Sequence, residues 1–432
     1  MHFVKEMTKK RTAEGIYKKA VLDNGIRIVT EKIPYLRSVS IGIWINSGSR
    51  DEDDINRGIS HFLEHLAFKG TEKRSAKQIA FEMDSIGGQI DAFTSREYTC
   101  YSAKVLDEHL PIAIDLLSDI LLNSTYKPSD IEKERQVILE EIKFVEDNPT
   151  DYIYDLLYKC VWSEHPLGLP ILGNVESIKK IGRDAVIAHL DKHYLPRNMV
   201  IAAAGNIDED KLRKMLERSF GNLKRNGPSQ RQTPPEIKKN LIIKERELEQ
   251  IHFCLGTKGL KSADDNRYDG YILNTILGGS MSSRLFQKIR EDYGLTYSIH
   301  SFISPYADTG LLGIYAGTSP AFFNKVLKMS LEELKILKKV KVSDNEIKRS
   351  KDQLKGNLIL SLESSISRMN QLAKQEIYFG RYFSMDEIIA EIEKVRGDNI
   401  QSLAKKLLED SFFNLAILGP VKKGEISLDL LQ

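Results

Sequence analysis

The stretch SVSIGIWINSGSRDED, residues 38–53, indicates how this chain begins its fold. Its β-branched residues occupy every second position: Val39, Ile41, Ile43 and Ile45. Strict alternation of this kind is typical of a β-strand with one buried face. Trp44 lies on the opposite, otherwise small or polar face, so we expect that face to be covered too.

The next stretch, RGISHFLEHLAFKG (57–70), changes the hydrophobic period from two to about 3.6. Its apolar residues follow helical spacing, with Ser60 as a possible N-cap and Gly70 as the stop. We therefore expect a strand followed by a helix.

The remaining segments mix strands and helices in the same way. The turn sequence Asp23-Asn24-Gly25 predicts a hairpin over 20–34. Periodicity predicts further strands over 89–105 and 199–207, and further helices over 75–86, 107–122 and 129–147. The expected fold class is α+β, with mixed or antiparallel sheets and helices packed on them.

Two parts of the chain resemble each other. SDIEKER (129–135) resembles SDNEIKR (343–349), an offset of 343 − 129 = 214, and HFLEHLAFKG faces YILNTILGGS (271–280). A proline-rich, polar stretch separates the two copies. We expect homologous domains over 1–222 and 243–432, joined by a linker over 223–242. At the 214 offset Glu141 faces Lys355, so only the first domain carries the metal-ligating residue types.

Composition excludes several classes of protein. The 432 residues include 63 basic and 61 acidic ones, a balance that argues against nucleic-acid binding. No apolar run approaches the roughly 20 residues that span a bilayer, and the basic start lacks the apolar region of a secretory signal. The three cysteines form no C-x-x-C pair and indicate free thiols. We expect a cytoplasmic protein that does not act on membranes.

The pentad HFLEH (61–65) carries the chemistry. Residues four apart share one face of a helix, so His61 and His65 can direct their imidazoles at one metal ion. Zinc needs a third protein ligand, and a catalytic site keeps water in the fourth position. By itself the pentad is also compatible with ordinary polar residues on a helix.

HFLEH has the inverted order H-x-x-E-H, and with it the chain resembles the pitrilysin-type (inverzincin, M16) zinc metallopeptidases, including the processing peptidases and their short bacterial homologues. The resemblance extends over the whole chain through these blocks: GGQIDAFTSREYT (87–99), HPLGLPILG (165–173), YLPRNMVIAAAGNI (194–207) and LGGSMSSRLFQKIREDYGLTY (277–297).

The resemblance implies roles for individual residues. In the family, a glutamate about 76 residues after the second histidine completes the zinc site, and here 141 − 65 = 76. His61, His65 and Glu141 would bind one Zn²⁺ per chain, and Glu64 would take the proton of the zinc-bound water. Glu134, two helical turns before Glu141, would orient a ligand or the substrate amine, or else remain a solvated carboxylate.

Two other histidines are candidates for the third ligand. His109 lies at a helix start and His165 in a loop rich in proline and glycine, and both fit structural roles better. Glu140 is adjacent to Glu141 and points to another face of the helix.

The resemblance also predicts substrate-binding residues. Arg290 and Tyr297 in the second half would reach the peptide, with the Tyr297 hydroxyl stabilising the oxyanion. The segment Asp91, Ala92, Phe93 and Thr94 occupies the place of the family's edge strand, which pairs with an extended peptide. Asp91 replaces the usual asparagine and leaves subsite preference open. Each of these residues also has an alternative without a role in substrate binding. Residues 91–94 can be an ordinary sheet strand, Arg290 an exposed helix residue and Tyr297 an aromatic residue of a strand.

The resemblance therefore implies a zinc metalloendopeptidase whose two domains close like a clamshell around a peptide chamber. Expected substrates are oligopeptides or unfolded, presequence-like segments. Short chains of the family pair, so a homodimer or a heterodimer with a related chain is expected. A non-catalytic scaffold that binds peptides and a zinc hydrolase of non-peptide amides are the other hypotheses. No phosphate-binding G-x-x-x-x-G-K pattern is present.

Overall fold

The computed structural model describes residues 8–11, 16–224, 233–422 and 426. The chain folds into two compact units. Unit 1 comprises residues 1–142, 170–232 and 361–384, and unit 2 comprises residues 143–169, 233–360 and 385–432. Each unit consists of one β-sheet with helices, which confirms the predicted α+β class.

Unit 1 contains a seven-stranded sheet in the order β1-β2-β3-β7-β4-β6-β5. The pairs are antiparallel except β3 with β7, which run parallel. The strands are β1 (Thr8–Arg11), β2 (Ile16–Val21), β3 (Arg27–Lys32), β4 (Ser38–Ile45), β5 (Gln89–Thr94), β6 (Thr99–Leu106) and β7 (Met199–Gly205).

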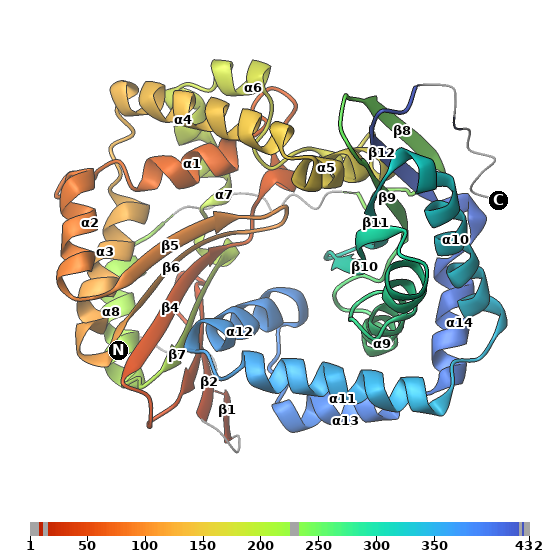
Figure 1. Cartoon of the computed structure of the whole chain (residues 1–432). Helices are drawn as coiled ribbons and strands as arrows, with labels where there is room; N and C mark the ends of the chain where they lie inside the picture. The colour runs from red at the N-terminus through yellow and green to blue at the C-terminus, as the bar shows by residue number, and fades with distance from the viewer. Residues whose placement is uncertain (1–7, 12–15, 225–232, 423–425, 427–432) are drawn as a thin grey trace. The chain divides into compact units, whose positions relative to one another are not determined.

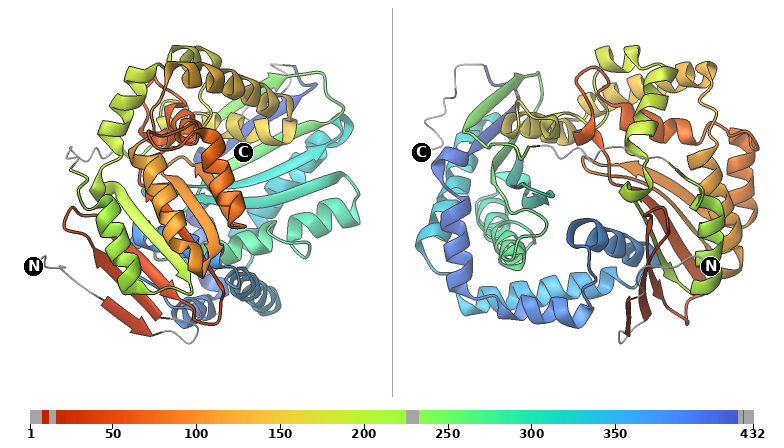
Figure 2. Two further views of the ribbon diagram at one scale, coloured as in Figure 1. Left: turned by 90° about the vertical axis from the view of Figure 1, so that its left-hand side faces the viewer. Right: turned by 180° about the vertical axis from the view of Figure 1, so that it is seen from behind.

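Helices cover both faces of this sheet (Figures 1 and 2). Those from the first half of the chain are α1 (Ile59–Ala67), α2 (Ala76–Ser85), α3 (Leu110–Leu122), α4 (Pro128–Asp147), α6 (Val175–Lys180), α7 (Arg183–His193) and α8 (Glu209–Phe220). The main core lies between them and the sheet, and it includes Ile41 and Ile43 of β4 together with Phe62 and Leu66 of α1.

The opposite face is covered by α12 (Ser365–Phe379), which comes from the second half of the chain. Figure 1 shows α12 lying against this face of the sheet. Trp44 is completely buried there and shares an apolar cluster with Met369 and Leu372 of α12. The expectation that the Trp44 face is covered is therefore confirmed.

Polar contacts also hold α12 on the sheet. The Arg368 guanidinium of α12 lies 2.9 Å from the Glu31 carboxylate of β3, and both side chains are buried. Glu376, nearly inaccessible to solvent, lies 2.8 Å from Lys19 and 3.3 Å from Arg27. Buried charges require partners of opposite charge, so these ion pairs fix the position of α12 on the sheet.

Unit 2 contains a five-stranded sheet in the order β10-β11-β9-β12-β8. Its strands are β8 (Asn240–Glu245), β9 (Ile251–Lys258), β10 (Thr296–Pro305), β11 (Gly310–Thr318) and β12 (Asn414–Gly419). Its helices are α5 (Pro149–Val161), α9 (Arg267–Leu277), the π-helix η5 (Phe286–Asp292), α10 (Phe323–Lys339), α11 (Asp344–Ser361), α13 (Met385–Lys394) and α14 (Gly397–Leu407).

Short 3₁₀ turns complete both units. In unit 1 they are η1 (Ser49–Asp51), η2 (Asp107–His109) and η4 (Pro196–Asn198). In unit 2 they are η3 (Pro166–Gly168), η6 (Pro320–Phe322) and η7 (Asp410–Phe412).

The two sheets share one topology. Strands β3, β7, β4, β6 and β5 correspond in order and direction to β8, β12, β9, β11 and β10. The helix packed on the second sheet, α5, comes from the first half of the chain, just as α12 comes from the second. Each half of the chain therefore contributes one helix to the unit built mainly by the other half.

A glycine in each sheet allows this helix to approach. A Cβ atom on Gly42 of β4 would lie 3.1 Å from Met369, and one on Gly256 of β9 would lie 2.9 Å from Leu157 of α5. These glycines are 256 − 42 = 214 residues apart, the same offset as the helix repeat. At both positions a side chain would press on the helix that lies over the strand, and glycine avoids this contact.

Most predicted elements are confirmed, with small differences. The hairpin over 20–34 is β2 with β3, and the helix over 129–147 is α4. The single strand predicted over 89–105 is a hairpin of β5 and β6. The predicted bounds of α1 are wrong at both ends, because its N-cap is Gly58 and it ends at Ala67.

The division at 1–222 and 243–432 remains a prediction about the homologous halves. The compact units follow it except for the exchanged segments 143–169 and 361–384. Part of the predicted linker, 225–232, lies outside the described residues, and its last residues begin β8. In the described part of the chain, every helix is too short or too polar to cross a membrane.

Replacing Glu31 with glutamine tests the attachment of α12. The substitution removes the carboxylate that faces the buried Arg368, so we expect it to lower the free energy of unfolding by about 3–5 kcal/mol. Urea unfolding followed by circular dichroism measures this. The control is Glu236→Gln, which breaks an exposed pair with Lys238 and should leave stability essentially unchanged. Equal effects of the two substitutions would show that the pair of Arg368 with Glu31 does not hold α12 on the sheet.

Candidate metal centre

The helix α1 presents His61 and His65 on one face. The apolar side of the helix is buried against the sheet, where Phe62, Leu63 and Leu66 are inaccessible. This packing fixes the rotation of the helix, so the imidazoles one turn apart lie side by side with ring centroids 4.6 Å apart.

Glu141 reaches the same place from α4. Its Oε2 lies 3.6 Å from Nε2 of His61 and 3.6 Å from Nε2 of His65. The ligand atoms of these three residues all lie within 4.8 Å of one another. They are the one group of three or more potential metal ligands found among the described residues.

Glu134, two turns before Glu141 on α4, contacts His65. Its Oε2 lies 3.2 Å from Nδ1 of His65, and its Oε1 lies 2.8 Å from Nζ of Lys69. Glu134 is buried, and Lys69 supplies its counter-charge. A carboxylate on the far nitrogen of a metal-binding histidine directs the other nitrogen at the metal.

The donor set fits zinc. Burial, together with the charge of neighbouring His65, lowers the pKa of His61 to about 3, so its imidazole is neutral and able to bind a metal at neutral pH. Two imidazole nitrogens and one carboxylate oxygen are the ligand types of catalytic zinc sites that keep one position for water. Their convergence on one point is the observation that supports this fit.

Glu64 lies on α1, between the two histidines, and is hydrogen-bonded to a residue of β5. The Thr94 hydroxyl of β5 donates a 2.6 Å hydrogen bond to Oε2 of Glu64. Burial raises the pKa of the Glu64 carboxyl above its usual value, although the Thr94 hydrogen bond and nearby His65 oppose the shift. A carboxylate with a raised pKa is a better proton acceptor at neutral pH.

The predicted substrate strand is β5, and it forms one edge of the sheet. Ala92 and Thr94 face α1 and the main core, whereas Phe93 contacts Trp44 on the α12 face. Asp91 is exposed, and its Oδ1 accepts a 3.0 Å hydrogen bond from the amide of Ala92. Thr94 therefore connects the edge strand to the metal helix.

Arg290 and Tyr297 belong to unit 2. The Arg290 guanidinium lies 4.5 Å from the ring centre of Phe286 and 5.2 Å from that of Tyr297, which is 81% exposed. Their roles in substrate binding remain predictions.

The rival third ligands have other contacts. His165 accepts a hydrogen bond from the amide of Leu167 through Nδ1 and donates one to the carbonyl of Thr233 through Nε2. His109 lies in η2, 3.9 Å from Glu108. Glu140 is exposed, as its place on the helix predicts.

Unit 2 has a different arrangement around the helix that corresponds to α1. In α9, Tyr271, Asn274 and Thr275 occupy the positions aligned with His61, Glu64 and His65. Ser301 of β10 donates a 2.8 Å hydrogen bond to Asn274, in the manner of Thr94 and Glu64. The scaffold contact is kept while the metal-ligating residue types are absent at these positions.

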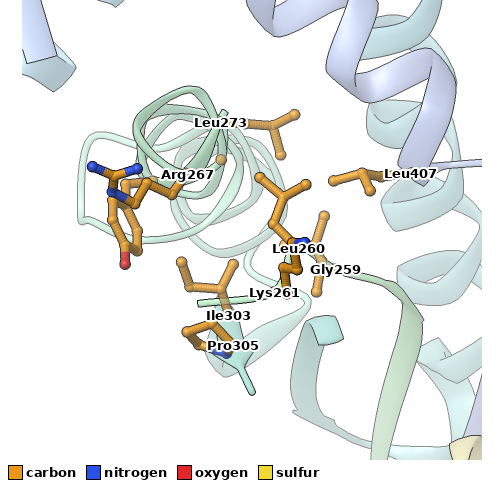
Figure 3. Close-up of a pocket in the computed structure, with 11 residues that line it drawn as sticks. Gly259, Leu260, Lys261, Arg267, Leu273, Ile303, Pro305 and Leu407 are labelled. Carbon is orange, nitrogen blue, oxygen red and sulfur yellow. The ribbon is translucent and has the colours of Figure 1, made fainter. Parts of the chain in front are cut away.

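An apolar pocket lies beside α9 in unit 2 (Figure 3). It has an empty volume of about 380 Å³. Residues lining it include Leu260, Leu273, Ile303, Pro305 and Leu407. None of the predicted catalytic or metal-binding residues lines this pocket.

Sequence reasoning missed two partners of the site. The contact of Thr94 with Glu64 joins residues 30 apart in the chain, and no local spacing reveals it. Lys69 lies two residues after the end of α1 and four residues after His65, a spacing that the sequence shows. Its partner Glu134 lies on another helix, so the spacing does not reveal their contact.

Comparison with known proteins shows which family this chain belongs to. A family model described as Insulinase (Peptidase family M16) matches residues 27–175, and one described as Peptidase M16 inactive domain matches residues 180–354. An uncharacterized zinc protease of Bacillus subtilis, YmxG, is 44% identical over 93% of this chain and 98% of its own length. The chain belongs to the M16 peptidase family. The predicted family is confirmed.

A second relative agrees in name, and two solved structures agree in fold. An uncharacterized zinc protease of Streptomyces coelicolor is 40% identical over 96% of this chain and 92% of its own. A protease from Helicobacter pylori has a TM-score of 0.88 at 20% identity, covering 94% of this chain and 99% of that one. A chain of Complex III2 from Candida albicans has a TM-score of 0.83 at 23% identity, covering 96% and 98%. The relatives' names agree with the predicted zinc cofactor, and the solved structures show the fold.

Replacing Glu141 with glutamine tests the third ligand. We expect wild-type protein to hold about one zinc per chain and the variant to lose it on dialysis, because an amide is a poorer zinc ligand than a carboxylate. Atomic absorption measures the metal content. The matched control is Glu140→Gln, one residue away on another face, which should keep its zinc. Normal zinc affinity in Glu141→Gln would require a different third ligand.

Proposed function

We propose that this chain is a zinc metalloendopeptidase that cleaves oligopeptides or unfolded, presequence-like segments. The observation that supports the proposal best is the convergence of His61, His65 and Glu141 beside a carboxylate, Glu64, that an edge strand holds in place. His61, His65 and Glu141 would hold the metal, with Glu134 and Lys69 fixing the orientation of His65.

Zinc bound there supplies a Lewis acid that polarises the peptide carbonyl and lowers the pKa of water to about 7. Glu64 acts as the general base and then as the general acid. Its raised pKa suits both steps, because the carboxylate takes a proton from the attacking water and the carboxyl returns it to the leaving amine. Thr94 keeps Oε2 of Glu64 hydrogen-bonded during this exchange.

The peptide binds as an added strand on β5. Within the described residues β5 pairs with β6 on one side and ends the sheet on the other, so its outer backbone groups are available for pairing. Because Thr94 joins β5 to Glu64, a peptide on this edge lies close to the general base. The exposed carboxylate of Asp91 favours basic side chains or an amino terminus on the peptide.

Arg290 and Tyr297 complete the proposal as substrate-binding residues of unit 2. Arg290 would bind a substrate carbonyl, and the exposed Tyr297 hydroxyl would donate to the oxyanion. The stacking of Arg290 on Tyr297 limits the freedom of both side chains.

The location and assembly are part of the same proposal. All three cysteines are free and buried, which fits a cytoplasmic protein. We propose a dimer, either of two such chains or with a related chain.

Replacing Glu64 with glutamine tests the general base. Glutamine keeps the size and the hydrogen bond acceptor for Thr94 but takes up no proton, so we expect cleavage of a quenched fluorescent basic peptide to fall at least 100-fold. Zinc content should stay at the wild-type level because Glu64 is not a ligand.

The control for this test is removal of the metal. A chelator should abolish cleavage, and added zinc should restore it. Full activity in Glu64→Gln would rule out the mechanism. A wild-type chain that binds peptide, binds no metal and cleaves nothing would favour the hypothesis of a non-catalytic scaffold. Cleavage of non-peptide amides alone would favour the hypothesis of a zinc hydrolase that acts on such amides.

Replacing Tyr297 with phenylalanine tests the oxyanion donor. Loss of one such donor costs about 100- to 1,000-fold in kcat, so we expect a fall of this size with little change in KM. The matched control is Tyr293→Phe, an exposed tyrosine four residues earlier in unit 2. Steady-state kinetics distinguishes them, and equal rates in both variants would remove Tyr297 from the mechanism.

A further inference from the structure

The two histidines of the metal centre are held in different ways. Nδ1 of His65 contacts Glu134, whereas Nδ1 of His61 is buried without a hydrogen-bond partner among the described residues. A metal-binding histidine is normally oriented by a partner on its other nitrogen. The orientation of His61 therefore depends on packing and on the backbone of the first turn of α1.

That first turn is held by a residue outside the helix. The N-cap, Gly58, has φ +87° and no side chain with which to cap the helix. Instead, Oε2 of Glu52 accepts a 2.6 Å hydrogen bond from the amide of Gly58, and Oε1 accepts a 2.8 Å hydrogen bond from the amide of Ser60. Both donors belong to the residues just before His61.

Glu52 is itself fixed by its surroundings. It is only 7% exposed and directly follows the 3₁₀ turn η1. Within that turn, Arg50 lies 2.8 Å from the buried carboxylate of Glu97, in the turn between β5 and β6. The amide of Arg50 also donates a 2.8 Å hydrogen bond to the carbonyl of Arg96. The segment thus joins α1 to this hairpin.

The approach of the segment to the hairpin is close. A Cβ atom on Gly48 would lie 2.2 Å from the carbonyl oxygen of Ser95, so only glycine fits. Ser95 is the residue after Thr94, the hydrogen-bond partner of Glu64. Residues 48–52, which we name the bracket segment, therefore hold the first turn of α1 at one end and the Thr94 hairpin at the other.

We propose that Glu52 is a positioning residue of the metal centre. By binding the first amides of α1 it holds the turn that carries His61 and sets the spacing of His61 relative to His65 and Glu141. Glu52 touches neither metal nor substrate in this role. The inference rests on the proposed function only in assigning zinc to the site.

Replacing Glu52 with glutamine tests this role. The amide keeps the size but exchanges one acceptor for an N–H₂ group that faces a backbone N–H. We expect zinc affinity, measured by competition with a chromogenic chelator, to fall by about 3- to 10-fold. This is less than the roughly 10- to 100-fold loss on removing a direct hydrogen-bond partner of a metal ligand, because Glu52 acts through the backbone. Urea unfolding of the metal-free protein gives the accompanying change in stability.

The matched control is Ser75→Ala. Ser75 caps α2 in the same unit by accepting a hydrogen bond from the amide of Gln78, and α2 carries no metal ligand. This variant should lose stability as a cap deletion does, yet bind zinc within about twofold of wild type. Removing a helix cap in general would then be separated from removing the one beside His61.

If Glu52→Gln folds, two results would overturn the proposal. One is wild-type zinc affinity in Glu52→Gln, and the other is an equal loss of affinity in Ser75→Ala. If Glu52→Gln does not fold, Glu52→Asp is the second variant. It keeps the carboxyl group on a side chain that is one methylene shorter, so the hydrogen bonds to the amides of Gly58 and Ser60 should be lost. Unchanged zinc affinity in Glu52→Asp would therefore also overturn the proposal. A wild-type chain that binds zinc but cleaves no peptide contradicts the proposed function and leaves this inference intact.

Discussion

The sheet of unit 1 is apolar on both faces, and the burial of the second face is the constraint on which the rest depends. One half of the chain supplies enough helices for the first face only. Trp44 and its neighbours would remain exposed without α12, which the chain delivers from more than 300 residues away. Burying a large aromatic side chain of this kind contributes a few kcal/mol, at about 25 cal/mol per Å² of apolar surface. Each sheet therefore needs a helix from the other half of the chain to cover its second face.

This dependence extends to the metal centre. Tyr378 of α12 donates a 2.9 Å hydrogen bond to Glu97, which also binds Arg50. Glu97 lies three residues after Thr94, and Thr94 holds Glu64. The second half of the chain thus helps to position the hairpin that carries Thr94, the hydrogen-bond partner of Glu64, through packing and buried polar contacts.

The two units show how a duplicated scaffold can separate roles. The sheet order, the exchanged helix and the glycine that admits it are repeated, because each solves the same packing problem. The residues facing the centre are not repeated, since Asn274 and Ser301 keep the contact of Glu64 and Thr94 without a carboxylate. Packing constrains the scaffold positions, whereas the chemistry requires its residue types in only one copy.

The sequence by itself determined the α+β class, the repeat, most elements and the H-x-x-E-H pattern of His61, Glu64 and His65, because periodicity and motif spacing are local properties of the chain. Its resemblance to M16 peptidases assigned Glu141, and helical spacing then placed Glu134 on the same face. Only the tertiary structure decided which helix covers Trp44, that Thr94 holds Glu64, and that Glu52 caps α1 in place of Ser60. Each of these contacts joins segments that no sequence period relates, and they form only when burial of the sheet's two faces brings those segments together.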